Sequence, residues 1–132
     1  MAKRIRPSDI RATLREGIRH DLVILAIPSH DRHNKLLNQQ ELFTDEAMRL
    51  FADLYGGATA VTAYKGVYLS TEGPTQGEYL WDNPLLVQSY CDREYVEDLN
   101  RLQKLLQFIR AMKRSLDQEC VLLIVNEYRW FV

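Results

Sequence analysis

The segment that most constrains the fold is Asp21–Ile27 (DLVILAI), an aspartate followed by six apolar residues, which Pro28 ends. Successive side chains of a β-strand point to opposite faces of its sheet. Both alternating sets are apolar here except at the first residue. We therefore expect a central strand that is covered on both faces of its sheet.

Two helices are predicted from apolar residues that recur at helical spacing. The first runs from Thr44, expected as its N-cap, to Gly56-Gly57, where glycine suits the left-handed C-cap. The second covers about Glu94–Gln118, with Asp92 as its cap. Acidic residues come early and basic residues late in the second helix, as the helix dipole favours.

Three further strands complete the predicted sheet. They are Ala58–Ser70, read as an edge strand with a bulge near Lys65, then Leu85–Tyr90 and Cys120–Val125. The order β-α-β-β-α-β is that of the ferredoxin-like split βαβ fold. With right-handed crossovers it predicts an α+β domain: a four-stranded antiparallel sheet, ordered 4-1-3-2, with both helices on one face.

The first 20 of the 132 residues form a basic arm ahead of this single domain, residues 21–132. The arm contains six Lys or Arg residues and only two acidic residues. A short N-terminal helix is predicted from Pro7 through Ile10, Leu14 and Ile18. The arm could touch nucleic acid, although a formal net charge of -1 argues against binding by bulk charge. Either this helix or a second copy of the sheet in a homodimer could cover the second face.

The two cysteines, Cys91 and Cys120, have no zinc-type spacing and are expected at opposite ends of the sheet. We therefore expect free thiols and a cytoplasmic protein. The longest apolar runs have six residues, too short to span a bilayer. Membrane insertion is not expected.

The predicted topology brings two long polar loops, 29–43 and 71–84, and the turn 117–119 to one edge of the sheet. Loops of this length are often functional. The candidate residues for catalysis are His30, Asp31 and His33; those for ligand binding are Ser29, Arg32, Lys35, Glu78, Trp81 and Asp82.

Two interpretations of this edge stay open. Imidazole and carboxylate groups could hold a divalent metal, while Arg32 or Lys35 grips a phosphate oxygen. Alternatively, Asp31 and Asn34 bond their own backbone in the turns of a polar surface loop. A weaker candidate, a Cys91 thiolate activated by His20, competes with a plain buried thiol, which the sequence favours.

The order of elements resembles small ferredoxin-like proteins: metabolite sensors, oligomeric regulators, RNA-binding modules and the small CRISPR adaptation nuclease. The nuclease carries an aspartate at the end of its first strand, which corresponds to Asp31, but its loop is shorter. The RNA-binding modules need aromatic residues that the first strand lacks. We expect a binding or regulatory module that acts through protein contacts as a homodimer; the alternative is a metal-dependent nuclease or phosphodiesterase.

Overall fold

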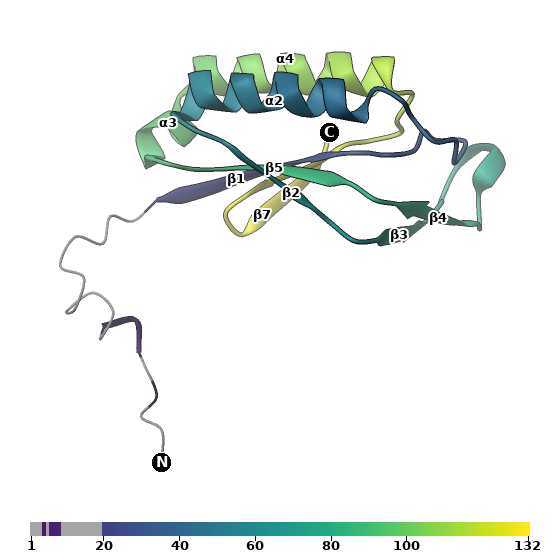
Figure 1. Ribbon diagram of the computed structural model, residues 1–132, viewed down its shortest axis with the longest axis horizontal. Helices are drawn as coiled ribbons and strands as arrows, with labels where there is room; N and C mark the ends of the chain where they lie inside the picture. The colour runs from purple at the N-terminus through teal and green to yellow at the C-terminus, as the bar shows by residue number, and fades with distance from the viewer. Residues whose placement is uncertain (1–3, 5, 9–19) are drawn as a thin grey trace.

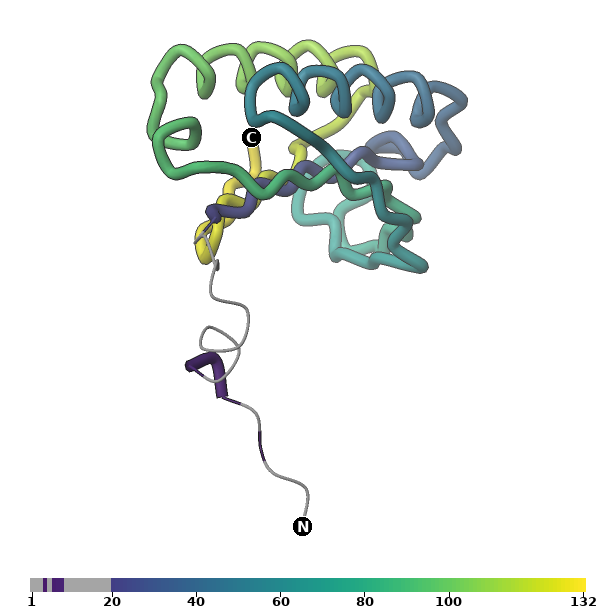
Figure 2. The backbone as a smooth tube through the Cα atoms, turned by 60° about the vertical axis from the view of Figure 1, so that its left-hand side comes forward, coloured from purple at the N-terminus to yellow at the C-terminus, as the bar shows by residue number. Residues whose placement is uncertain are grey.

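The computed structural model describes residues 4, 6–8 and 20–132, so most of the predicted N-terminal helix lies outside the described residues. Two helices form one layer and a twisted sheet forms the other, with a small ribbon at one end (Figure 1, Figure 2). In chain order the elements are β1 (Asp21–Ile27), α2 (Gln40–Tyr55), β2 (Thr59–Thr62), β3 (Gly66–Leu69), the 3-10 turn η1 (Gly73–Thr75), β4 (Tyr79–Asp82), β5 (Leu85–Cys91), α3 (Arg93–Glu97), α4 (Leu99–Ser115), β6 (Leu122–Val125) and β7 (Tyr128–Phe131).

The predicted α+β class is confirmed, but the sheet is larger than predicted. The main sheet has five strands in the order β2-β5-β1-β6-β7, and each neighbouring pair is antiparallel. β3 and β4 form a separate two-stranded ribbon. The four-stranded sheet expected from the sequence therefore describes only part of the architecture.

The predicted strand 58–70 is divided between the two sheets. β2 pairs with β5 as far as Thr62 opposite Leu85. The residue before Leu85 is Pro84, which has no amide hydrogen to extend the ladder, and its carbonyl accepts the last bond, from the amide of Ala63. The chain then turns, and β3 takes a new partner, β4, inside what the sequence predicted to be a loop.

The predicted long second helix is broken at Asp98, which has an extended backbone (φ -74°, ψ 115°). Its carboxylate accepts the amide of Arg101 at 3.1 Å and the Arg101 guanidinium at 2.6 Å. Asp98 thus starts α4 as its N-cap, a role that aspartate fills well. The expected cap of the first helix, Thr44, lies inside α2 and donates its hydroxyl to the Gln40 carbonyl.

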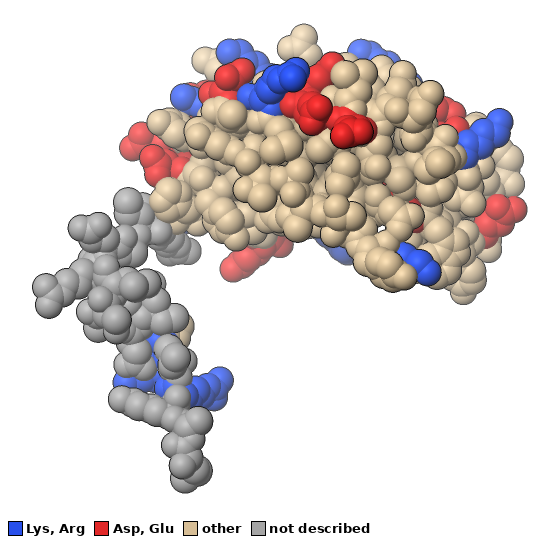
Figure 3. Space-filling model, viewed as in Figure 1, with Lys and Arg blue, Asp and Glu red and all other residues tan. Residues whose placement is uncertain are grey.

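The core lies between the helices and one face of the sheet. Alternate residues of β1, namely Val23, Leu25 and Ile27, are buried there against Phe51 of α2 and Ile109 of α4. The side chains between them point to the opposite face and are only partly buried. Figure 3 shows charged side chains gathered over the helix layer, at the top of the view. Within the described residues, no helix is long and apolar enough to cross a membrane.

We predict that Asp98→Ala lowers the urea midpoint at neutral pH, because the Arg101 amide loses its partner. That hydrogen bond holds the pKa of Asp98 below its ordinary value. The stabilisation is therefore present above the pKa of the unfolded carboxyl and is lost as the pH falls through the lower folded pKa. Asp92→Ala is the matched control, since Asp92 precedes α3 without a side-chain capping bond. Equal midpoints for the two variants at pH 7 would contradict the assignment.

Candidate functional site

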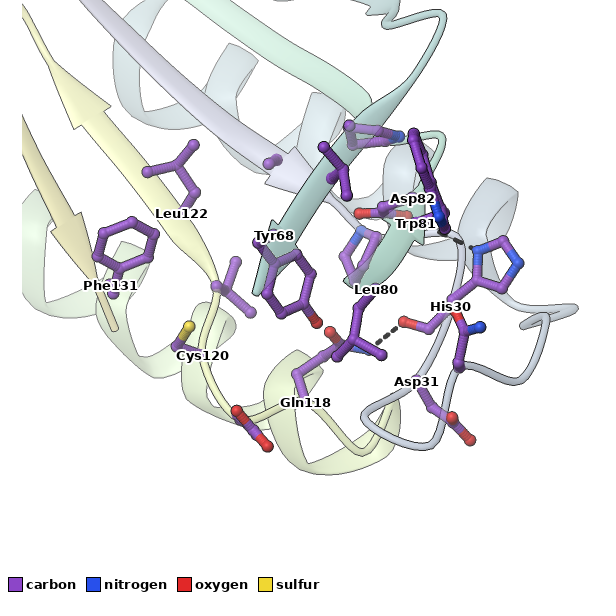
Figure 4. A pocket seen from close by; sticks show the side chains of 18 of the residues that line it. His30, Asp31, Tyr68, Leu80, Trp81, Asp82, Gln118, Cys120, Leu122 and Phe131 are labelled. Atoms are coloured by element: carbon purple, nitrogen blue, oxygen red, sulfur yellow. Dashed lines mark hydrogen bonds and ion pairs between the residues drawn. The ribbon is translucent and has the colours of Figure 1, made fainter. Parts of the chain in front are cut away.

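A pocket of about 530 Å³ lies where the β3–β4 ribbon meets the face of the main sheet that the helices leave open (Figure 4). Ala26, Leu122 and Phe131 come from the main sheet. Tyr68 and Leu80 come from facing positions of the ribbon. Apolar and aromatic side chains thus form most of the walls, as is usual for small-molecule sites.

Three segments far apart in the sequence meet at the polar end of this pocket. They are the loop after β1, the end of β4 and the turn before β6. The Gln118 side-chain amide donates to the His30 carbonyl at 2.6 Å, and the backbone amide of Ser29 donates to Asp82 Oδ1 at 2.7 Å. The structure therefore brings His30, Asp31, Trp81 and Asp82 of the predicted site to one pocket.

Ser29 is the buried centre of this junction. Its hydroxyl donates to Asp82 Oδ1 at 2.5 Å and accepts the backbone amide of Asn83 at 2.8 Å. His30 Nδ1 lies 2.7 Å from the same hydroxyl oxygen. Because the one hydroxyl proton goes to Asp82, Nδ1 of His30 must be the donor in their bond. A neutral His30 then keeps Nε2 as an acceptor.

The remaining predicted site residues are used elsewhere. Arg32 and His33 face Asp117, at 2.9 and 3.4 Å. Asp31 reaches the pocket, but its Oδ1 accepts the amides of His33 and Lys35, as the surface-turn interpretation expects. Lys35 and Glu78 are not among the lining residues. In the described part of the chain, no group of three His, Cys, Asp or Glu side chains could hold a metal ion.

The charge of the pocket is negative. Asp31, Asp82 and Glu119 line it, and none of the described lining residues is Lys or Arg. Burial raises the pKa of the Tyr68 hydroxyl, and the nearby Glu119 and Asp82 carboxylates raise it further. Tyr68 therefore stays protonated at neutral pH and can donate a hydrogen bond into the pocket.

Sequence reasoning missed the walls of the pocket. Tyr68, Leu80 and Phe131 become neighbours only through the ribbon and the β6–β7 hairpin, neither of which was predicted. The alternation in GVYL and YLWD, two short strand-like segments flanking a glycine-containing turn, was the available signal for the ribbon.

Cys91 lies outside this pocket, at the far end of the sheet, and is buried. Burial raises the pKa of its thiol to about 11, with further contributions from Asp21 and Asp92. At neutral pH it is therefore a thiol and a poor nucleophile. Cys120 is exposed and lines the pocket.

No family model matches this sequence, and no curated protein is similar to it at the sequence level. Two solved structures share the fold. A phage SAM lyase in complex with S-methyl-5'-thioadenosine superposes with a TM-score of 0.58 at 15% identity, over 88% of this chain and 92% of that chain. A phage SAM lyase in the apo state gives 0.52 at 15% identity, over 86% and 88%. At this identity the likeness shows the fold alone.

We predict that iodoacetamide at pH 8 alkylates Cys120 in the native protein and leaves Cys91 unmodified until urea unfolds the chain. Burial raises the pKa of both thiols, to about 11 for Cys91, but only Cys120 is exposed to the reagent. Mass spectrometry of the peptides reads both sites. Cys120→Ser should abolish native labelling; labelling of Cys91 in the folded protein would contradict the model of a closed core.

Proposed function

We propose that this chain binds a small cationic nucleoside, S-adenosylmethionine in the first place, in the pocket beside the β3–β4 ribbon. We further propose that it cleaves this ligand. The observation that carries the proposal is the lining itself: aromatic and apolar walls with three carboxylates and, among the described residues, no Lys or Arg. Such a pocket favours a cation and disfavours phosphates.

The chemistry of S-adenosylmethionine matches these walls. Its adenine offers a flat surface for stacking on an aromatic side chain such as Tyr68. Its ribose hydroxyls can donate to carboxylates, and its sulfonium is attracted to carboxylates and aromatic faces. A volume of about 530 Å³ lies within the range of pockets that enclose ligands of this size.

The shared fold supports the choice of this ligand among other organic cations. One of the two similar structures is a SAM lyase that holds S-methyl-5'-thioadenosine. That molecule is S-adenosylmethionine without its amino-acid chain. Cleavage of the bond between the sulfonium sulfur and that chain sends the bonding electrons to sulfur and releases it as a neutral thioether, which is a good leaving group. The ligand's own carboxylate can attack the carbon that loses sulfur, so that the amino-acid chain leaves as a lactone and the step needs no other reactant. We also propose that β6, β1, β5 and β2 are an elaborated ferredoxin-like core.

Self-association is the second candidate function. Leu22, Ile24 and Ile124 point to the sheet face opposite the helices and are only half-buried, and Tyr90 on the same face is exposed. A second copy of this face would cover these apolar groups, which supports the expected homodimer.

The free thiols support a reducing, cytoplasmic setting. Metal-dependent nuclease activity stays a prediction without a supporting donor set in the described residues.

Ligand binding is tested by the fluorescence of a single tryptophan. The chain has two, so Trp130→Phe leaves only Trp81, which lines the pocket. We expect a saturable change with S-adenosylmethionine and with S-methyl-5'-thioadenosine, and none with ATP, whose phosphates the carboxylates repel. Trp81→Phe, which leaves only Trp130, is the control and should report no comparable change.

Chromatography of the same S-adenosylmethionine mixture should show S-methyl-5'-thioadenosine accumulating with time. Binding without product would reduce the proposal to a ligand-binding domain. The absence of saturable binding by either adenosine compound would reject it.

Self-association is tested by sedimentation velocity over a concentration series. The wild-type chain should form dimers, and Tyr90→Glu should shift it toward monomers by placing a charge on the open face. Tyr128→Glu is the matched control, because Tyr128 is similarly exposed but lies opposite Val125, on the helix side of the sheet. A wild-type chain that stays monomeric at every concentration would remove this candidate.

A further inference from the structure

We infer that Asp82 is the residue that makes the pocket select a positively charged ligand over a neutral one of the same shape. The inference rests on the proposed function and assigns its charge specificity to one carboxylate. It follows from how Asp82 is held, from what surrounds its charge and from what the other acids of the pocket do.

The position of Asp82 is fixed from one side only. Its Oδ1 accepts both the backbone amide and the hydroxyl of Ser29, at 2.7 and 2.5 Å. Ser29 is 4% exposed and is itself held by the amide of Asn83. The second oxygen, Oδ2, has no hydrogen-bond partner in the described part of the chain. Asp82 therefore presents a preoriented, free acceptor at the pocket wall.

The negative charge of Asp82 has little compensation from the protein. No Lys or Arg within the described ranges forms an ion pair with it, and His30 Nδ1 lies 4.0 Å from its Oδ1. Its side chain is only 20% exposed, so water screens the charge weakly. A bound cation would supply the missing counter-charge and offset the cost of burying the carboxylate.

One aromatic side chain shares the ribbon face of this carboxylate. Tyr68 lies opposite Leu80 and therefore on the face of Leu80 and Asp82 (Figure 4). Trp81 points to the other face, and Lys65 Nζ lies 5.9 Å from the centre of its ring. The pKa of Tyr68, raised first by burial, is raised further by Glu119 and Asp82, as expected for a hydroxyl near both acids. A sulfonium or ammonium group placed here would meet the Asp82 carboxylate and the Tyr68 ring together.

The other two acids of the pocket are less suited to this role. Asp31 is engaged by the amides of His33 and Lys35 in its own turn. Glu119 approaches Gly73, and no hydrogen bond orients its carboxylate in the described structure. Of the three acids, Asp82 is the one whose first oxygen is held by the buried Ser29 while its second oxygen stays free at the pocket.

The test compares two ligands that differ in charge at one position. Sinefungin carries an amine in place of the methylated sulfur of S-adenosylmethionine and resists cleavage, whereas S-adenosylhomocysteine has a neutral sulfur there. Calorimetry measures the affinity of both ligands for the wild-type protein and for Asp82→Asn, whose amide oxygen still accepts from Ser29. Asp53→Asn, on the exposed side of α2, removes the same charge far from the pocket and is the matched control.

We expect Asp82→Asn to weaken the binding of sinefungin roughly tenfold or more and that of S-adenosylhomocysteine by less than about twofold. Asp53→Asn should change neither. Ser29→Ala, which frees Asp82 from its anchor, should lower the preference for sinefungin in part. An unchanged preference in Asp82→Asn, or equal losses for both ligands in a variant that melts like wild type, would overturn the inference. Failure of wild type to bind either ligand would instead reject the proposed function.

Discussion

The central position of β1 is the constraint on which the rest of the structure depends. It pairs with β5 on one side and β6 on the other, and it buries every second side chain under α2 and α4. The next residues, Pro28 and Ser29, are still buried. The polar loop therefore leaves the sheet from a rigid point, and the Ser29 hydroxyl can join the end of β1 to the end of β4. Core and pocket are built on the same strand.

The described lining of the pocket carries acidic side chains without Lys or Arg, although the chain as a whole is nearly neutral. The total formal charge is -1, yet the described lining contains three carboxylates and no Lys or Arg. Arg32 is paired with Asp117, and Lys65 lies near the Trp81 ring without lining the pocket. Local geometry, more than composition, determines which ligand charge such a pocket accepts, because the field in a partly buried site falls off slowly.

Particular elements show how far sequence patterns reached. DLVILAI predicted β1 with its correct ends, and the glycine pair marked the end of the first helix, because these signals are local. Asp98 was placed among the acidic residues early in one long helix, whereas its cap geometry starts a new helix there. The ribbon was missed because each of its strands has four residues and gains its stability only from pairing with the other.

The sequence by itself determined the α+β class, the central strand and the polar segments beside it, since hydrophobic periodicity and turn residues act over a few neighbours. It also put His30, Asp31, Trp81 and Asp82 on the list of candidates. Only the tertiary structure decided that Tyr68, Leu80 and Phe131 wall the pocket, that Arg32 and His33 turn away, and that one oxygen of Asp82 stays free. These outcomes depend on strand register and on contacts between residues more than fifty positions apart, which no local pattern encodes.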